Sequence, residues 1–193
     1  MKKPNIGPSF LETLSAFRPG DAREAAELSA MLDLFAREGK RLLLRETAYA
    51  HFTASAIILN AKRDRTLMAY HRIYDSWAWT GGHADGEDDP EGIARREAEE
   101  ETGIPFLTRL GPGAASVEIL PVWAHKRRGK DVPSHLHLNV SYLFQADDSL
   151  PLRRREEENR AVAWLPCAAL SDYVSEPPMM PVYLRLLKRA NDF

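Results

Sequence analysis

Residues 81–104 read GGHADGEDDPEGIARREAEEETGI, and this stretch decides the fold. Its second half predicts a helix over about residues 90–102. Asp89 has the short polar side chain that caps a helix N-terminus, and Pro90 fits the first turn. Gly103 supplies the C-terminal stop.

The glutamates of this helix share one face. An α-helix turns about 100° per residue, so Glu97, Glu100 and Glu101 fall within an arc of roughly 100°, whereas Glu99 points elsewhere. Like charges at such spacings destabilise a helix, and a divalent cation such as Mg²⁺ or Mn²⁺ removes that conflict because it prefers carboxylate oxygens. Arg96 can hold one carboxylate by a bidentate pair. The alternative is a solvated, charged surface helix.

The glycine pair lies upstream of the helix. Gly81 and Gly82 give the backbone freedom for a tight loop, and their carbonyls could face the same cation. His83 follows at once and is either a phosphate or metal contact or a plain loop residue. We therefore expect loop and helix to form one site.

This spacing resembles the signature of the Nudix hydrolases: a glycine, five residues, an acid, seven residues, then Arg-Glu-aliphatic-x-Glu-Glu-x-Gly-aliphatic. Counting from Gly82, the acid is Asp88 and the arginine is Arg96. The family usually has glutamate where Asp88 stands, so the adjacent Glu87 is the other candidate for this acid. The later positions are occupied by Glu97, Ala98, Glu100, Glu101, Gly103 and Ile104.

The resemblance implies an α/β (α+β) fold, in the form of an α/β/α sandwich with a mixed β-sheet, over residues 46–193. It also implies a pyrophosphohydrolase that cleaves a nucleoside diphosphate linked to another moiety, X, with Mg²⁺ or Mn²⁺ as cofactor. The cation would make water a usable nucleophile and offset charge on the phosphate oxygens.

The same resemblance assigns roles to residues. The carbonyl of Gly82 would join the three glutamates of the shared face as a metal ligand, and Arg96 would complete the catalytic set. The base that accepts the proton of water would be one of these glutamates or an acid elsewhere, such as Glu158. The expected set is therefore Gly82, Arg96, Glu97, Glu100 and Glu101, with Glu158 also near the substrate.

Outside the signature, residues 1–45 lie beyond the resemblance. Residues 9–40 have helical spacing with a break at Pro19-Gly20, which predicts an N-terminal helical extension. Short apolar or alternating runs predict strands, and two short helices close the chain. The expected strands cover residues 52–59, 67–71, 117–124, 135–145 and 162–165, and the helices residues 167–173 and 181–190.

Several polar and aromatic residues are candidates for binding substrate. Trp77 and Trp79 either pack in the core or form a wall on which a base stacks. His135 and His137 alternate with leucines, so their side of the strand faces either solvent or a polar cleft. Two histidines at this spacing could also bind zinc, but no third ligand is visible nearby. The basic turn Lys126–Lys130 is either a solvated hairpin turn or a phosphate clamp.

The composition argues against a nucleic-acid-binding, membrane or secreted protein. The 193 residues carry 26 basic and 28 acidic side chains, so the net charge of −2 gives no broad cationic face for nucleic acid. No apolar run is long enough for a membrane span or a secretory signal. The single cysteine, Cys167, cannot form an internal disulfide. We expect a cytoplasmic protein that takes a small nucleotide or other diphosphate, with a homodimer possible.

Two other functions remain open. A ligand-sensing module could keep the fold and lack hydrolysis, as Asp88 and the extra helices would allow. An isoprenoid diphosphate isomerase shares the fold but uses a cysteine near the glycines, whereas Cys167 lies far along the chain.

Overall fold

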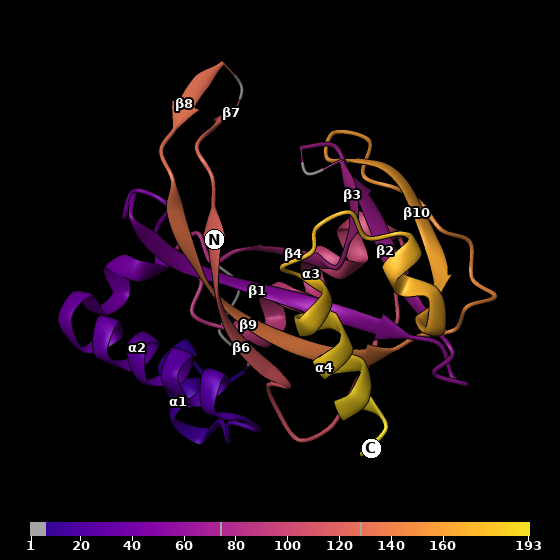
Figure 1. Cartoon of the computed structure of the whole chain (residues 1–193), viewed down its shortest axis with the longest axis horizontal. Coiled ribbons are helices and arrows are strands. Elements are labelled where there is room, and N and C mark those ends of the chain that lie inside the picture. Colours follow the sequence, from indigo (N-terminus) through magenta and orange to yellow (C-terminus); the bar gives the residue numbers. More distant parts are fainter. Residues whose placement is uncertain (1–6, 74, 128) are drawn as a thin grey trace.

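The protein is built around a mixed β-sheet of eight strands (Figure 1). A computed structural model describes residues 7–73, 75–127 and 129–193. The main order is β10-β2-β1-β9-β5, with β3 on β2, β4 on β1 and β6 on β9. The central pair β1 and β9 is parallel and all other pairs are antiparallel. The strands are β1 (Ala50–Leu59), β2 (Arg65–His71), β3 (Ser76–Ala78), β4 (Thr80–His83), β5 (Thr108–Leu110), β6 (Ser116–Val122), β9 (His135–Gln145) and β10 (Asn159–Pro166).

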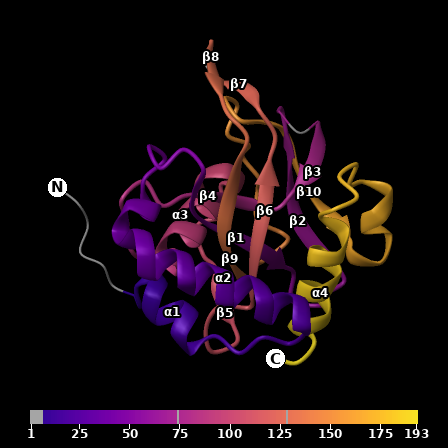
Figure 2. The ribbon, with the colours of Figure 1, turned by 60° about the vertical axis from the view of Figure 1, so that its left-hand side comes forward.

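A small hairpin extends beyond this sheet. Strands β7 (His125–Arg127) and β8 (Lys130–Val132) pair with each other and project past the sheet in both views (Figures 1 and 2). The hairpin occupies the predicted basic turn. Residue 128 of that turn lies outside the described residues.

Helices cover the sheet in two layers. They are α1 (Phe10–Ala16), α2 (Ala22–Glu38), α3 (Pro90–Thr102) and α4 (Met180–Ala190), with 3-10 turns η1 (Gly39–Leu43) and η2 (Cys167–Asp172). One apolar core joins α1, α2 and α3 to the sheet, and a second joins η2 and α4 to it. The predicted α/β/α sandwich with a mixed sheet is confirmed.

Strand β1 shows how one segment serves both cores. All ten of its residues are buried. Phe52 and Ile58 face the first core, whereas Ile57 and Leu59 face the second. This double burial explains the continuous apolar run over residues 56–59, which is typical of a central parallel strand.

Local signals set the ends of α3. The carboxylate of Asp89 accepts a hydrogen bond from the N–H of Gly92 (2.9 Å), and Pro90 opens the first turn. Gly103 ends the helix in the left-handed region at a φ of 76°, which glycine adopts without steric cost. The predicted bounds of this helix are confirmed.

The N-terminal helices share the first core. Phe10, Leu14 and Met31 are fully buried there. Figure 2 shows α2 crossing in front of β6, where Glu24 of α2 meets Ser116 in a 2.7 Å hydrogen bond. The predicted helical pattern is confirmed, and the division into an extension of residues 1–45 and a domain of residues 46–193 stays a prediction.

Every helix in the described part of the chain is too short or too polar to cross a lipid bilayer.

Candidate active site

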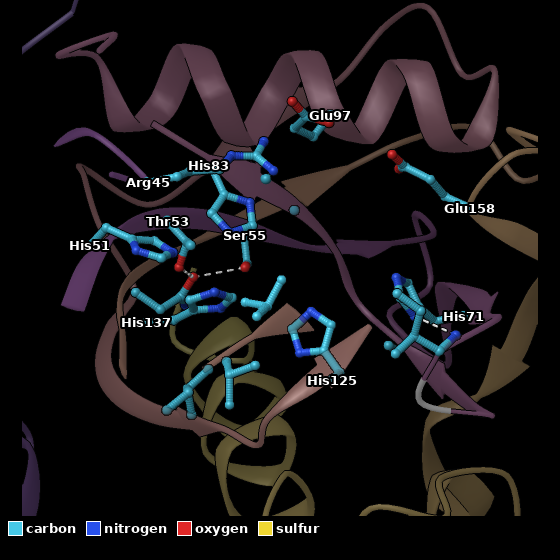
Figure 3. Close-up of a pocket in the computed structure, with 18 of the residues that line it drawn as sticks. Arg45, His51, Thr53, Ser55, His71, His83, Glu97, His125, His137 and Glu158 are labelled. Carbon is cyan, nitrogen blue, oxygen red and sulfur yellow. Dashed lines mark hydrogen bonds between the residues drawn. The ribbon is translucent and has the colours of Figure 1, made fainter. Parts of the chain in front are cut away.

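A cavity of about 1210 Å³ is lined by side chains of α3 and of the sheet (Figure 3). Its wall combines carboxylates from α3 with polar side chains from β1, β4 and β9. All six histidines of the chain border it. The predicted residues found in this wall are Trp79, Gly82, His83, Glu97, Glu100, Glu101, His135, His137 and Glu158.

The double glycine is part of a strand. We expected a tight loop, but Gly81 and Gly82 belong to β4 and pair with Ser55 and Ala54 of β1. That expectation was wrong, because the loop forms later, where Gly86 has a φ of 85°. A Cβ on Gly81 would lie 2.5 Å from Ser55 Oγ. Glycine is required here for close approach.

Gly82 allows α3 to lie against β4. A Cβ on Gly82 would stand 2.5 Å from Cδ and 2.7 Å from Oε1 of Glu97. A Cβ at this position would therefore push the Glu97 carboxylate away from its place against β4. The Gly82 backbone and the Glu97 carboxylate are therefore brought together, as the predicted site requires.

Glu101 fastens α3 to the neighbouring strands. Its Oε1 accepts the N–H of Gly81 (3.0 Å) and its Oε2 accepts an N–H of Asn159 (2.7 Å). The side chain is 4% exposed. Burial raises the pKa of Glu101 to about 7, although both hydrogen bonds act to lower it. This carboxylate is held in place with one lone-pair position used on each oxygen.

Glu97, Glu100 and Glu158 converge on one cationic atom. Nη1 of Arg155 lies 3.0 Å from an oxygen of Glu100, 3.5 Å from one of Glu97 and 3.6 Å from one of Glu158. Burial raises the pKa of Glu97, against the opposing effects of Arg96 and Arg155. Arg155 was missed from the sequence, where residues 153–158 balance three basic with three acidic side chains and resemble an exposed loop.

Of the two candidate acids, Glu87 and Asp88, Arg96 contacts Glu87. Its Nη1 lies 2.5 Å from Glu87 and its Nη2 lies 3.4 Å from Glu97. Asp88 instead accepts the N–H of Phe10 (3.0 Å) and pairs with Lys40 (3.1 Å). Glu87 is thus the acid next to the glutamate face, and Asp88 binds the N-terminal helices.

The two tryptophans have different surroundings. Trp79 borders the cavity and makes an edge-on contact with Tyr183, with ring centroids 5.4 Å apart. Trp77 meets Tyr70 edge-on at 5.5 Å and packs against the second core. It is absent from the described cavity wall. Only Trp79 is positioned to contact a bound molecule.

The polar side of β9 faces the cleft rather than solvent. His135 and Asn139 are 8% and 1% exposed, and both border the cavity with His137. Oδ1 of Asn139 accepts hydrogen bonds from Thr53 (2.9 Å) and Ser55 (2.8 Å). The solvent-facing alternative was therefore wrong for this strand.

His51 is a histidine close to His137 that the sequence analysis did not identify. It stands opposite His137 in the parallel pairing of β1 and β9. One ring nitrogen each from His51, His83 and His137 lies within 4.8 Å of the other two. Burial lowers the pKa of His51, and burial together with the neighbouring histidines lowers the pKa of His137 to about 3. The alternation of His51, Thr53 and Ser55 with apolar residues was the available signal.

Other candidates lie at or beyond the edge of the site. Lys126 of the predicted phosphate clamp borders the cavity. Cys167 lies on η2 against the second core, and burial raises the pKa of its thiol to about 11. The one cysteine of the chain is therefore away from the glycines and poorly suited to the isomerase chemistry.

Comparisons with known proteins agree with this geometry. A family model described as NUDIX domain matches residues 50–189. A curated relative from Streptomyces rubellomurinus, CMP-5'-(N-acetyl-N-hydroxy-3-aminopropyl)phosphonate hydrolase, is 46% identical over 66 residues, or 30% of this chain. The match covers 32% of that protein, so the chain spans about a third of the length of the curated relative it matches.

Solved structures share the fold. A NUDIX-family hydrolase from Clostridium perfringens has 19% identity and a TM-score of 0.52, covering 72% of this chain and 96% of that one. A Nudix hydrolase from M. smegmatis has 15% identity and a TM-score of 0.54, covering 76% and 88%. With the family match over most of its length, the chain belongs to the Nudix hydrolase family.

Proposed function

We propose that this hydrolase cleaves the diphosphate linkage of a nucleoside diphosphate joined to another group, X, with Mg²⁺ or Mn²⁺ as cofactor. The observation that carries the proposal is the position of Arg155. Its Nη1 stands 3.0–3.6 Å from oxygens of three carboxylates that come from α3 and the loop before β10. A guanidinium nitrogen thus marks a point where these oxygens favour positive charge.

The donor set fits a hard divalent cation. Glu97 and Glu100 present carboxylate oxygens, and Glu101 is held beside them by Gly81 and Asn159. Mg²⁺ and Mn²⁺ prefer such oxygens. These glutamates, with the carbonyl of Gly82, would hold the cation. Bound there, it would lower the pKa of water and offset charge on phosphate oxygens.

The chain's own groups then perform the positioning and the proton transfer. Arg96 holds Glu97 from one side while Glu87 holds Arg96 from the other. A water oxygen attacks one phosphorus, the bridging P–O bond breaks, and the leaving phosphate takes the bond electrons. The proton released from water passes to a cavity carboxylate, with Glu158, which comes from the loop before β10 rather than from α3, as the candidate.

The cavity is large enough for a nucleotide with a second group attached, since ligand sites commonly measure about 300–1000 Å³. Trp79 offers an aromatic face or edge to the base. The curated relative is named for the hydrolysis of CMP joined to a phosphonate. That name supports a substrate in which a nucleotide is linked to a further acidic group.

The test compares three glutamates of one helix. Glu100→Gln and Glu97→Gln should each lower metal-dependent turnover at least about 100-fold across a panel of nucleotides, nucleotide sugars and nucleotide phosphonates. Glu99→Gln is the matched control, because Glu99 lies on the same helix and outside the cavity wall. Undiminished turnover of Glu100→Gln with Mg²⁺ or Mn²⁺ would reject the assignment. Tight nucleotide binding by calorimetry without product would instead support a sensor.

A further inference from the structure

Five of the six histidines form a continuous group of rings along the cavity, and four of them are labelled in Figure 3. Ring centroids of His51 lie 5.0 Å from His83, 4.8 Å from His135 and 5.1 Å from His137. His83 and His137 are 4.8 Å apart, and His125 joins at the rim, 6.2 Å from His135.

Three strands bring these rings together. His51 and His137 are register partners on β1 and β9, while His83 on β4 stands opposite Thr53, two residues along β1. Side chains two residues apart on a strand share a face. The arrangement is therefore built into the sheet, on the central strands β1 and β9 and on β4, which pairs with β1.

The ring nitrogens have nearly the separation of metal ligands. Those of His51, His83 and His137 lie within 4.8 Å of one another. In a tetrahedral zinc site with Zn–N bonds of about 2.0–2.1 Å, ligand nitrogens are about 3.3 Å apart. The ring of His135 adjoins this set, with its Nε2 at hydrogen-bond distance (3.2 Å) from Nε2 of His137. Side-chain rotations that shorten these separations by up to about 1.5 Å would let the three nitrogens bind one ion.

Hydrogen bonds on the outer side orient the rings. Nδ1 of His51 lies 3.3 Å from the carbonyl of Thr47, which can only accept, so Nδ1 carries the proton and Nε2 keeps its lone pair. Nε2 of His51 is buried and has no hydrogen-bond partner among the described residues. A histidine that donates from one nitrogen to a carbonyl and offers the other is the usual arrangement at a metal.

Packing alone does not account for this group. A buried acceptor without a partner is unfavourable, and the polar rings stand where apolar side chains would fill the sheet. A transition-metal ion would satisfy the lone pair of His51 and link the three strands. Imidazole nitrogen suits ions such as Zn²⁺, whereas Mg²⁺ and Mn²⁺ favour the carboxylate end of the cavity.

We propose that His51, His83 and His137 bind a transition-metal ion of the Zn²⁺ type, separate from the cation of the glutamate site. Three protein ligands leave a coordination position open toward the cavity, available to water or to an oxyanion. The presence of the ion does not depend on the proposed diphosphate hydrolysis.

The test measures zinc binding while excess Mg²⁺ occupies the carboxylates. Full-length protein is stripped with EDTA, exchanged into buffer with Mg²⁺ and titrated with Zn²⁺ against a chromophoric chelator. We expect one equivalent of tightly bound Zn²⁺, and Co²⁺ in its place should give visible absorption bands of a histidine-ligated site. His51→Ala and His137→Gln should each weaken Zn²⁺ binding at least about 100-fold.

Two controls make the result decisive. His125→Ala removes a histidine from the rim of the same cavity, and Glu97→Gln alters the carboxylate end. Both should keep the zinc affinity of the original protein, and circular dichroism confirms that each variant is folded. The proposal is overturned if no Zn²⁺ binds, if His125→Ala loses as much affinity as His51→Ala, or if Glu97→Gln alone abolishes binding.

Discussion

Replacing Arg155 with methionine should tighten the binding of Mn²⁺ in the absence of substrate. The guanidinium lies 3.0–3.6 Å from oxygens of Glu97, Glu100 and Glu158, so a cation entering between these carboxylates must displace it. Methionine keeps much of the length of the side chain and removes the charge. The change therefore isolates the competition between the arginine and the metal.

The magnitude follows from the exposure of the partners. The Arg155 side chain is 35% exposed and those of its partners are 16–47% exposed. Pairs of this kind contribute about 0.2–1 kcal/mol each, so three pairs hold the guanidinium with about 1–2 kcal/mol. Releasing that free energy tightens Mn²⁺ binding about 5- to 30-fold, at 1.4 kcal/mol for each factor of ten.

Isothermal calorimetry on EDTA-treated protein measures the effect. Arg154→Met is the matched control, because this substitution removes the same charge one residue away. Arg154 pairs with Glu156 rather than with the three carboxylates. If Arg155→Met leaves the dissociation constant unchanged or raises it, the three carboxylates do not form the cation site. An equal shift in both variants would assign the effect to overall charge.

Three further predictions follow from single contacts. Gly82→Ala should lower kcat/KM about tenfold or more, because the added Cβ would stand 2.5 Å from Cδ of Glu97. The control Gly113→Ala, whose Cβ meets nothing within 4 Å, should leave kcat/KM unchanged. Arg189→Met should reduce the free energy of unfolding in urea by about 1–3 kcal/mol, since the fully buried Glu24 carboxylate loses both Arg189 contacts and keeps only Arg185, 3.7 Å away, as a cationic partner. A loss well below about 1 kcal/mol would contradict this. The free energy of unfolding should also fall as the pH drops below the unfolded-state pKa of glutamate. Burial acts to raise the pKa of Glu24 in the folded protein, but hydrogen bonds, led by that from Arg189, lower it. The ionised Glu24 therefore stabilises the fold above the unfolded-state pKa, and this stabilisation is lost as the pH falls toward the lower folded-state pKa. Urea midpoints measured from pH 6 to pH 3 should show a smaller loss in Glu24→Gln than in the original protein.

Short-range signals made the signature helix predictable. Asp89 and Gly103 act on backbone groups within a few residues, so the bounds of α3 follow from local chemistry alone. The spacing of the glutamates determines which of them share a face, whatever the helix packs against. The structure of the glycine pair depended instead on the pairing of β4 with β1, which no local pattern encodes.

Residues contributed by distant strands were the ones missed. The sequence shows His135 and His137 two positions apart, but the adjacent ring of His51 comes from a strand more than 80 residues earlier through a parallel pairing. Arg155 was hidden for a similar reason, since its partners lie on α3 and its own segment has balanced charge. Contacts of this kind are set by register between strands and by loop placement, which a single sequence leaves open.

The departure of Asp88 from the family signature has a structural reason in the N-terminal helices. The first N–H groups of a helix lack partners within it, and the N–H of Phe10, at the start of α1, donates to the Asp88 carboxylate at 3.0 Å. Negative charge is also favoured at that end of a helix dipole, and Lys40 holds the second oxygen at 3.1 Å. The acid at this position therefore binds the added helices, which leaves Glu87 to hold Arg96. Helix α1 and helix α3 are consequently held by adjacent carboxylates of one loop, because Asp88 binds the start of α1 and Glu87 binds the arginine that contacts Glu97.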